Sequence, residues 1–202
     1  MGYEDLERDL NFIKKTMEAS TRYRNIPTCG YVAAGALGAL GTLATYLLIG
    51  AEKTLELARL NQNDIVNLAL LWSGVFVLTI FGLVVLSVRR AKQRGISAWN
   101  SLAARMFLSQ VPLIIVAGLL TVGLTQHGCY SLVPAVWLTC YGLISYSFSY
   151  FTDFGHKVLG AVFIALGAAA CFAPDFYQPI LLGLGFGGVH LVYGLYRWTG
   201  SK

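Results

Sequence analysis

Six long apolar segments, separated by short polar ones, dominate the hydrophobic pattern of this chain. They run over about residues 30–50, 66–88, 106–125, 130–151, 158–173 and 180–196. Each approaches the roughly 20 residues that an α-helix needs to cross the hydrocarbon core of a bilayer. Because lipid offers no hydrogen-bond partners, only helices and closed barrels satisfy every backbone group there. The pattern therefore predicts an all-α, polytopic membrane protein whose six transmembrane helices form one domain, residues 28–202.

The first 27 residues have a different pattern, with apolar side chains at helical spacing among many charged ones. Leu6, Leu10, Ile13 and Met17 recur every three or four residues, so they share one face of a helix that ends at a proline. Residues 1–27 are therefore predicted to form an amphipathic cytoplasmic helix. It either lies on the inner leaflet with its lysines toward the phosphates, or it forms a seam that dimerises or receives a partner helix.

Composition and charge support this assignment and predict how the chain is threaded. Only 12% of the residues are charged, about half the share in soluble domains. Of the 15 lysines and arginines, all except Lys53 and Arg59 lie before the first apolar segment, in alternate loops after it, or at the C-terminus. Because cytoplasmic loops carry the excess of basic residues, both termini are predicted to be cytoplasmic. The net charge of +5 then suits contact of the basic residues with lipid phosphates, and no nucleic-acid binding is expected.

The last apolar segment carries a row of small residues around an imidazole. At 3.6 residues per turn, Gly183, Gly187, His190 and Gly194 fall within about 60° of one another on the helix surface. Helices associate in lipid by close approach over small residues, so this row predicts a packing surface, and its partner is expected on the first segment. The expected partner face comprises Gly30, Ala34, Gly38, Gly41 and Thr45.

His190 is also the only His, Lys, Arg, Asp or Glu in the six segments. An isolated ionisable group within a membrane is a candidate site by default, so His190 either binds a ligand or bonds a neighbouring helix as a neutral imidazole. A haem held by two histidines needs both at one depth, whereas His127 and His156 are expected at the two membrane surfaces. Only a symmetric oligomer would pair two copies of His190.

The most basic stretch lies between the second and third segments and is predicted to be a cytoplasmic loop. Its cations and its indole are expected to contact lipid headgroups or a protein partner. The residues concerned are Arg89, Arg90, Lys92, Arg94, Trp99 and Arg105.

Polar groups within the third and fourth segments predict two further features. Pro112 follows Gln110, and a proline at this position is expected to kink the third helix. The inner half of the fourth segment is crowded with hydroxyls, which either bond neighbouring helices or line a wet cavity. These are Thr139, Tyr141, Ser145, Tyr146, Ser147, Ser149 and Tyr150.

The chain is predicted not to be an enzyme, because no catalytic motif is recognisable. It has no serine–histidine–carboxylate grouping, no H-E-x-x-H and no phosphate-binding loop. The cysteines, at positions 29, 129, 140 and 171, lack the spacing of metal ligands, so no metal site is predicted and no cofactor is assigned. Cys129 and Cys171 are expected near the outer face, and whether they pair is left open.

Several short motifs are distributed over most of the chain. They are Ile13-Lys14-x-Thr16-Met17-Glu18-x-Ser20, Gly95-x3-Trp99 with Arg105, Pro112 with Ala117-Gly118-Leu119-Leu120-Thr121, Pro134-x2-Trp137-Leu138-x2-Tyr141-Gly142, and Gly185-Phe186-Gly187-Gly188-x-His190. In these motifs the chain resembles a family of small bacterial integral membrane proteins of unknown function. The resemblance implies a multi-pass protein of the bacterial cytoplasmic (inner) membrane, and it implies no activity. In that family the side chains in the inner half of the fourth segment are smaller and include glycine, so no shared ligand is implied there.

Three functions are consistent with these features. The first is a non-enzymatic structural or regulatory subunit whose basic cytoplasmic face docks a protein partner, within a homo-oligomer or a larger membrane complex. The second is a small transporter or channel that uses His190 and the polar fourth segment. The third is a haem- or quinone-binding membrane subunit.

Overall fold

The computed structural model describes residues 7–10, 23, 26–95, 97 and 99–199. Residues 7–10 are helical. The rest of the amphipathic helix predicted over residues 1–27 lies outside the described residues, apart from positions 23, 26 and 27, which are not helical.

Six stretches of the described chain are helical, long and apolar enough to cross a membrane. Their main elements are α2 (Thr28–Ile49), α4 (Gln62–Gln93), α5 (Ser101–Leu108) with α6 (Val111–Gln126), α7 (Val133–Phe148), α8 (Phe154–Phe172), and a last span made of α9 (Gln178–Gly183), η4 (Leu184–Val189) and α10 (His190–Thr199). The short helix α3 (Ala51–Leu55) follows α2, and no strand occurs among the described residues. The prediction of an all-α, six-span fold is confirmed.

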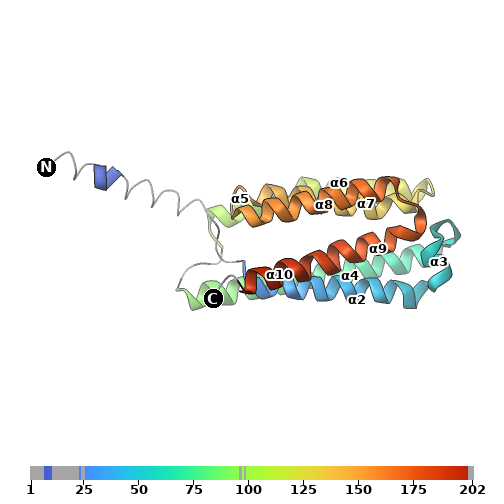
Figure 1. Ribbon diagram of the computed structural model, residues 1–202, viewed down its shortest axis with the longest axis horizontal. Helices are drawn as coiled ribbons and strands as arrows, with labels where there is room; N and C mark the ends of the chain where they lie inside the picture. Colours follow the sequence, from blue (N-terminus) through green and yellow to red (C-terminus); the bar gives the residue numbers. More distant parts are fainter. Residues whose placement is uncertain (1–6, 11–22, 24–25, 96, 98, 200–202) are drawn as a thin grey trace.

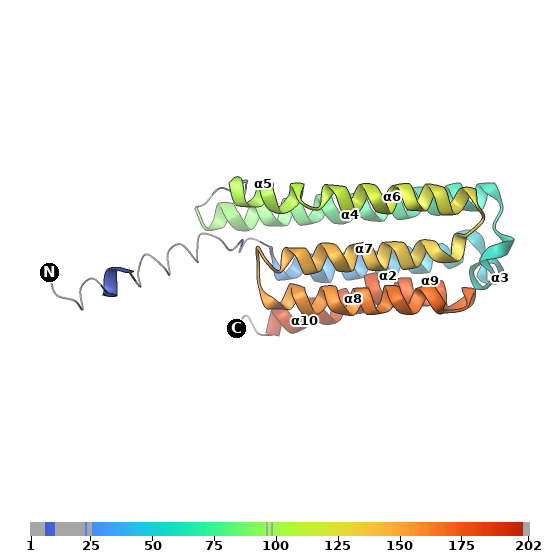
Figure 2. The same cartoon turned by 90° about the horizontal axis from the view of Figure 1, so that it is seen from above.

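The spans pack in two layers (Figures 1 and 2). In one layer α2 lies between α4 and the last span, and in the other α7 lies between α6 and α8. The start of α2, the turn between α7 and α8 and the end of α10 meet at one end of the molecule, opposite α3 (Figure 1). We call it the basic end, because it carries Arg89, Arg90, Lys92, Arg94, Arg105, Lys157 and Arg197. The opposite end is the far end.

Glycines bring α2 into backbone contact with the last span. A Cβ atom added at Gly35 would lie 2.7 Å from the backbone nitrogen of Leu191, and one at Gly38 would collide with the carbonyl of Phe186. Since no side chain fits between them, the two backbones approach as closely as helices in lipid require. Glycines of the last span complete the contact: Gly183 faces Thr42, Gly187 faces Ala39 and Gly194 faces Val32.

The face of α2 that was predicted to meet the last span is shared between two neighbours. Gly38 does face the last span, but Gly30 and Gly41 lie beside side chains of α4. Thr45 Oγ1 likewise accepts a 3.2 Å hydrogen bond from Trp72 Nε1 of α4. The predicted pairing of the first and last spans is therefore confirmed, but only part of the predicted face takes part in it, because α2 is the central helix of its layer and needs small residues on two sides.

A second close contact joins α7 to α8 in the other layer. A Cβ atom at Gly142 would lie 2.7 Å from the backbone nitrogen of Ile164, and one at Gly160 would lie 2.6 Å from the carbonyl oxygen of Gly142. Gly167 likewise leaves no room for a side chain against Thr139, further along the same pair of helices. Each layer therefore contains one pair of helices held backbone to backbone.

The outer helices α4 and α6 are attached differently and present large apolar side chains outward. None of the described residues in the most apolar stretch of α4 is buried. Trp137 Nε1 of α7 donates a 3.0 Å hydrogen bond to Thr121 Oγ1 of α6, which repeats the tryptophan–threonine bond between α4 and α2. Such exposure is typical of a helix that meets lipid over much of its surface.

The third span is broken between α5 and α6, two residues before Pro112. The backbone N–H of Gln110 bonds Phe107 O at 3.0 Å instead of continuing the helical ladder to Met106. Side chains replace the lost donor, because Ser109 Oγ and Gln110 Nε2 donate to Met106 O at 2.9 and 3.3 Å. The helix is therefore interrupted just before Pro112, where a kink was predicted, and the Met106 carbonyl, which loses its backbone donor there, is satisfied by these two side chains.

Replacing Gly38 by alanine should destabilise the fold, because the added methyl group would meet the backbone of the last span and such overpacking costs about 1–3 kcal/mol. Gly82→Ala is the matched control, since no described atom lies within 4 Å of a Cβ atom there. Thermal unfolding in detergent should show a lower midpoint for Gly38→Ala only. Equal midpoints would contradict the backbone contact.

Candidate functional site

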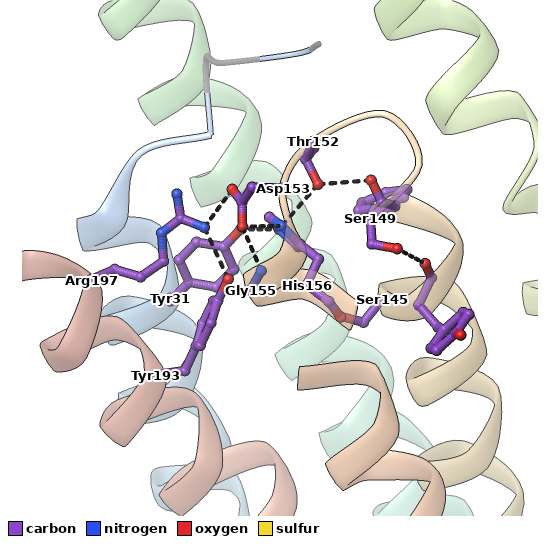
Figure 3. Close-up of polar contacts among 11 residues, drawn as sticks. Tyr31, Ser145, Ser149, Thr152, Asp153, Gly155, His156, Tyr193 and Arg197 are labelled. Atoms are coloured by element: carbon purple, nitrogen blue, oxygen red, sulfur yellow. Dashed lines mark hydrogen bonds and ion pairs between the residues drawn. The ribbon is translucent and has the colours of Figure 1, made fainter. Parts of the chain in front are cut away.

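Buried and half-buried polar side chains gather at the basic end, where the turn between α7 and α8 meets α2 and α10 (Figure 3). They are Tyr31 of α2, Thr152 and Asp153 of the turn, His156 of α8, and Tyr193 and Arg197 of α10. We call this group the basic-end network. Because its members come from both layers, the network ties the layers together.

Asp153 holds the start of α8 and the end of α10. Its carboxylate caps α8 by accepting a 2.9 Å hydrogen bond from Gly155 N, and it accepts a 2.7 Å bond from Arg197 Nη1. Partial burial acts to raise the pKa of Asp153, but its bonds with His156 and Arg197 outweigh burial and hold the pKa well below the ordinary value. The carboxylate is thus ionised at neutral pH.

His156 is 3% exposed, and both of its ring nitrogens have partners. Nδ1 lies 2.9 Å from Thr152 Oγ1, while Nε2 lies in a short hydrogen bond with the Tyr31 hydroxyl. The Thr152 hydroxyl donates its only proton to Phe148 O at 2.7 Å, so it must accept from Nδ1–H. Nε2 of a neutral ring then accepts from Tyr31, and every group in the chain of bonds is satisfied.

His190 makes a second tyrosine–histidine pair deeper in the protein. It is 3% exposed, its Nε2 lies 2.6 Å from the Tyr141 hydroxyl, and its Nδ1 lies 3.4 Å from Gly185 O. Since a carbonyl only accepts, Nδ1–H donates to Gly185 and Nε2 accepts from Tyr141. The rings of Phe163 and Phe186 pack around this imidazole at centroid distances of 5.1 and 6.1 Å. His190 is therefore a hydrogen-bonded group in an aromatic surround.

Both tyrosine–histidine pairs cross between the layers, in opposite senses. Tyr31 of the α2 layer reaches His156 of the α7 layer, whereas Tyr141 of the α7 layer reaches His190 of the α2 layer. Ser145 Oγ also donates a 3.1 Å bond to His156 O, between α7 and α8. Tyr141 and Ser145 of the hydroxyl-rich fourth span thus bond neighbouring helices, which was one of its two predicted roles.

The four residues of the predicted row on the last span have two different neighbours. Gly183, Gly187 and Gly194 face α2, while His190 faces Tyr141 of α7. The prediction assumed a regular helix, but Leu184–Val189 is π-helical. A π-turn holds an extra residue and so changes the angle between Gly183 and the residues that follow the turn, and the His190 side chain bonds the carbonyl of Gly185 within this turn.

The predicted basic contact residues lie on the surface of the basic end. Lys92, Arg94 and Arg105 are exposed, and Trp99 is 64% exposed while it stacks on Phe107 at a centroid distance of 6.0 Å. Arg89 and Arg90 differ from these, because they line a cavity of about 330 Å³ between the start of α2 and the end of α4. Its other lining residues are Pro27, Cys29, Leu86 and Gln93.

The basic-end network was not predicted as a unit. Of its members only His156 was given a predicted place, at a membrane surface, and it was not connected with Tyr31. The local signal was present, since Asp153 precedes His156 by three residues at the start of a helix, as in a helix cap. The contact with Tyr31 lies 125 positions away in the chain, so no local pattern reveals it.

Metal or haem ligation receives little support from the residues that the structure describes. Among them no group of three or more His, Cys, Asp or Glu side chains is placed to hold a metal ion. Cys129 and Cys171 are both free and exposed. The ring nitrogens of His156 and His190 are already hydrogen-bonded, so binding iron would require breaking a tyrosine–histidine pair or the bond on its other side.

Comparison with known proteins adds no relative. No known protein family, no curated protein and no solved structure matches this chain. The function is therefore argued from the site itself.

Replacing Asp153 by asparagine should destabilise the protein at neutral pH, by about 1 kcal/mol for this half-exposed carboxylate. Because its pKa is lowered in the folded state, its contribution is complete above the ordinary carboxyl pKa of about 4 and fades as the pH falls below that value. Thermal midpoints of parent and variant are followed in detergent from neutral pH to about pH 3, and the difference between them should narrow once the pH falls below about 4. A pH-independent difference would contradict this role.

Proposed function

We propose that this chain is a non-enzymatic membrane subunit, structural or regulatory, which docks a protein partner through its basic end on the cytoplasmic side. The contrast between the two ends of the molecule carries the proposal. At the far end, Lys53 Nζ lies 2.8 Å from the Asp64 carboxylate and Arg59 Nε lies 2.7 Å from the Glu56 carboxylate. The charges of these two cations are thus balanced locally.

At the basic end most cations are not balanced in this way. Arg89, Arg90, Lys92 and Arg105 form no ion pair with a carboxylate within the described part of the chain. Beside them the Trp99 indole is exposed. Unpaired cations around an exposed aromatic ring are typical of a surface that binds acidic partners, and the positive-inside rule favours a cytoplasmic orientation for it.

Site-specific photo-crosslinking in cells tests this proposal. A crosslinking amino acid at Trp99 should give a discrete protein adduct, and charge reversal of Lys92, Arg94 and Arg105 to glutamate should remove it. Leu119 is the matched control position, because it is 68% exposed on α6 within a membrane-spanning stretch. If no adduct forms at position 99, or if an adduct persists after charge reversal, docking through the basic end is refuted.

A second candidate function is a small transporter or channel for protons, and the two tyrosine–histidine pairs favour it. The Tyr193 ring packs on Tyr31 at a centroid distance of 4.9 Å and lies on α10 one turn from His190. Hydroxyl and imidazole groups at successive depths are the parts from which proton relays are built.

Proton flux into liposomes distinguishes this second candidate from the first. If the chain conducts protons, the parent protein should dissipate an imposed pH gradient and His190→Ala should not. His127→Ala, which changes an exposed histidine at the far end, is the control and should behave as the parent. Liposomes with the parent that leak no faster than protein-free liposomes would exclude the relay.

A further inference from the structure

The cavity at Arg89 and Arg90 is a candidate binding site that docking of a protein partner does not explain. It opens where α2 and α4 diverge near the basic end. Closer to the middle of the membrane α2 and α4 are in contact, since a Cβ atom at Gly30 would lie 3.0 Å from the Leu83 side chain. The cavity is therefore a pocket closed on its membrane side by helix packing and bordered by guanidinium groups at its mouth.

The charges around this cavity favour an anion. Arg89 and Arg90 contribute two guanidinium groups, and Gln93 adds an amide that donates hydrogen bonds. The charged groups that act on Arg90 include Arg94 and Arg197, which are also cations, and within the described residues no carboxylate pairs with Arg90. Guanidinium groups suit phosphate oxygens in particular, because their planar fork matches two oxygens at once.

The surroundings indicate that the anion belongs to a lipid. Leu86 and Pro27 line the same cavity, and Cys29, which also lines it, belongs to an exposed face of α2 that continues with large apolar side chains at helical spacing. Leu40, Leu43 and Leu47 are 61, 55 and 77% exposed on this face. A soluble phosphate would leave these apolar side chains uncovered, whereas the acyl chains of a lipid would cover them.

We propose that this cavity binds one anionic phospholipid. Arg89 and Arg90 contact its phosphate, Gln93 donates to the headgroup oxygens, and an acyl chain lies along the outer face of α2. The proposal goes beyond the docking function, because it concerns a lipid in the purified protein and needs no protein partner.

Cys29 provides a reporter, because it is exposed and lines the cavity. In a Cys129→Ser, Cys171→Ser background it is the exposed cysteine of the described chain, and its reaction with a neutral maleimide can be timed in nanodiscs. Replacing phosphatidylcholine discs by discs that also contain phosphatidylglycerol should slow labelling about fivefold, since one basic contact near the surface contributes about 1 kcal/mol. Unchanged labelling would overturn the proposal.

Two controls separate a bound lipid from the general charge of the leaflet. Arg90→Gln should abolish the protection, whereas Lys157→Gln removes one charge from the same end outside the cavity and should keep it. A cysteine at exposed Ser101, in a Cys29→Ser background, should show no comparable slowing. Protection that survives Arg90→Gln, or that is equal at residue 101, would show a leaflet effect and refute a site.

The source of the phosphate is tested in the same assay. Inorganic phosphate added to phosphatidylcholine discs should leave Cys29 labelling unchanged, and equal protection by it would refute a lipid site. Native mass spectrometry gives an independent measurement. The parent should retain one phosphatidylglycerol after delipidation, and the Arg89→Gln, Arg90→Gln double variant should retain none; retention by both would contradict the assignment. Neither result depends on whether a protein partner docks at Trp99.

Discussion

The architecture depends on one constraint, which is that helices in lipid gain nothing by hiding apolar surface from one another. Association must come from close van der Waals contact and from hydrogen bonds between helices. This chain meets the first requirement twice, where Gly35 and Gly38 receive the last span and where Gly142 and Gly160 join α7 to α8. These two backbone contacts define the layers, and the outer helices are added to them through tryptophan–threonine bonds.

The second requirement explains why the polar interior is arranged as it is. A buried imidazole or carboxylate without partners would be costly in lipid, so each must be bonded within the fold. The tyrosine–histidine pairs and the Asp153–Arg197 ion pair all run from one layer to the other. The polar groups that would destabilise the fold if they lacked partners therefore fix how the two layers pack against each other. This structural role is compatible with docking at the basic end. A proton relay would have to use the same tyrosine and histidine side chains.

The two ends of the molecule differ in how their charges are balanced, and both proposed binding surfaces depend on this difference. Ion pairs neutralise Lys53 and Arg59 at the far end. At the basic end Asp153 is paired with Arg197, whereas Arg89 and Arg90 line a cavity and pair with no carboxylate among the residues that the structure describes. An excess of unpaired cations beside apolar surface is what anionic headgroups and acidic protein surfaces both recognise. The cavity and the exposed Trp99 surface are distinct places, so one molecule can engage both.

The sequence by itself determined the six spans, the break before Pro112 and the importance of glycine in the last span. These are local properties, because hydropathy, a proline and a row of small residues can each be read within a single helix. Only the tertiary structure decided which neighbour each residue meets. The central position of α2 divides its small residues between two helices, and His190, beside the glycine contact, bonds Tyr141 of the other layer. Tyr31 and His156 meet for the same reason, since a contact across 125 positions depends on the arrangement of the layers and not on any spacing along the chain.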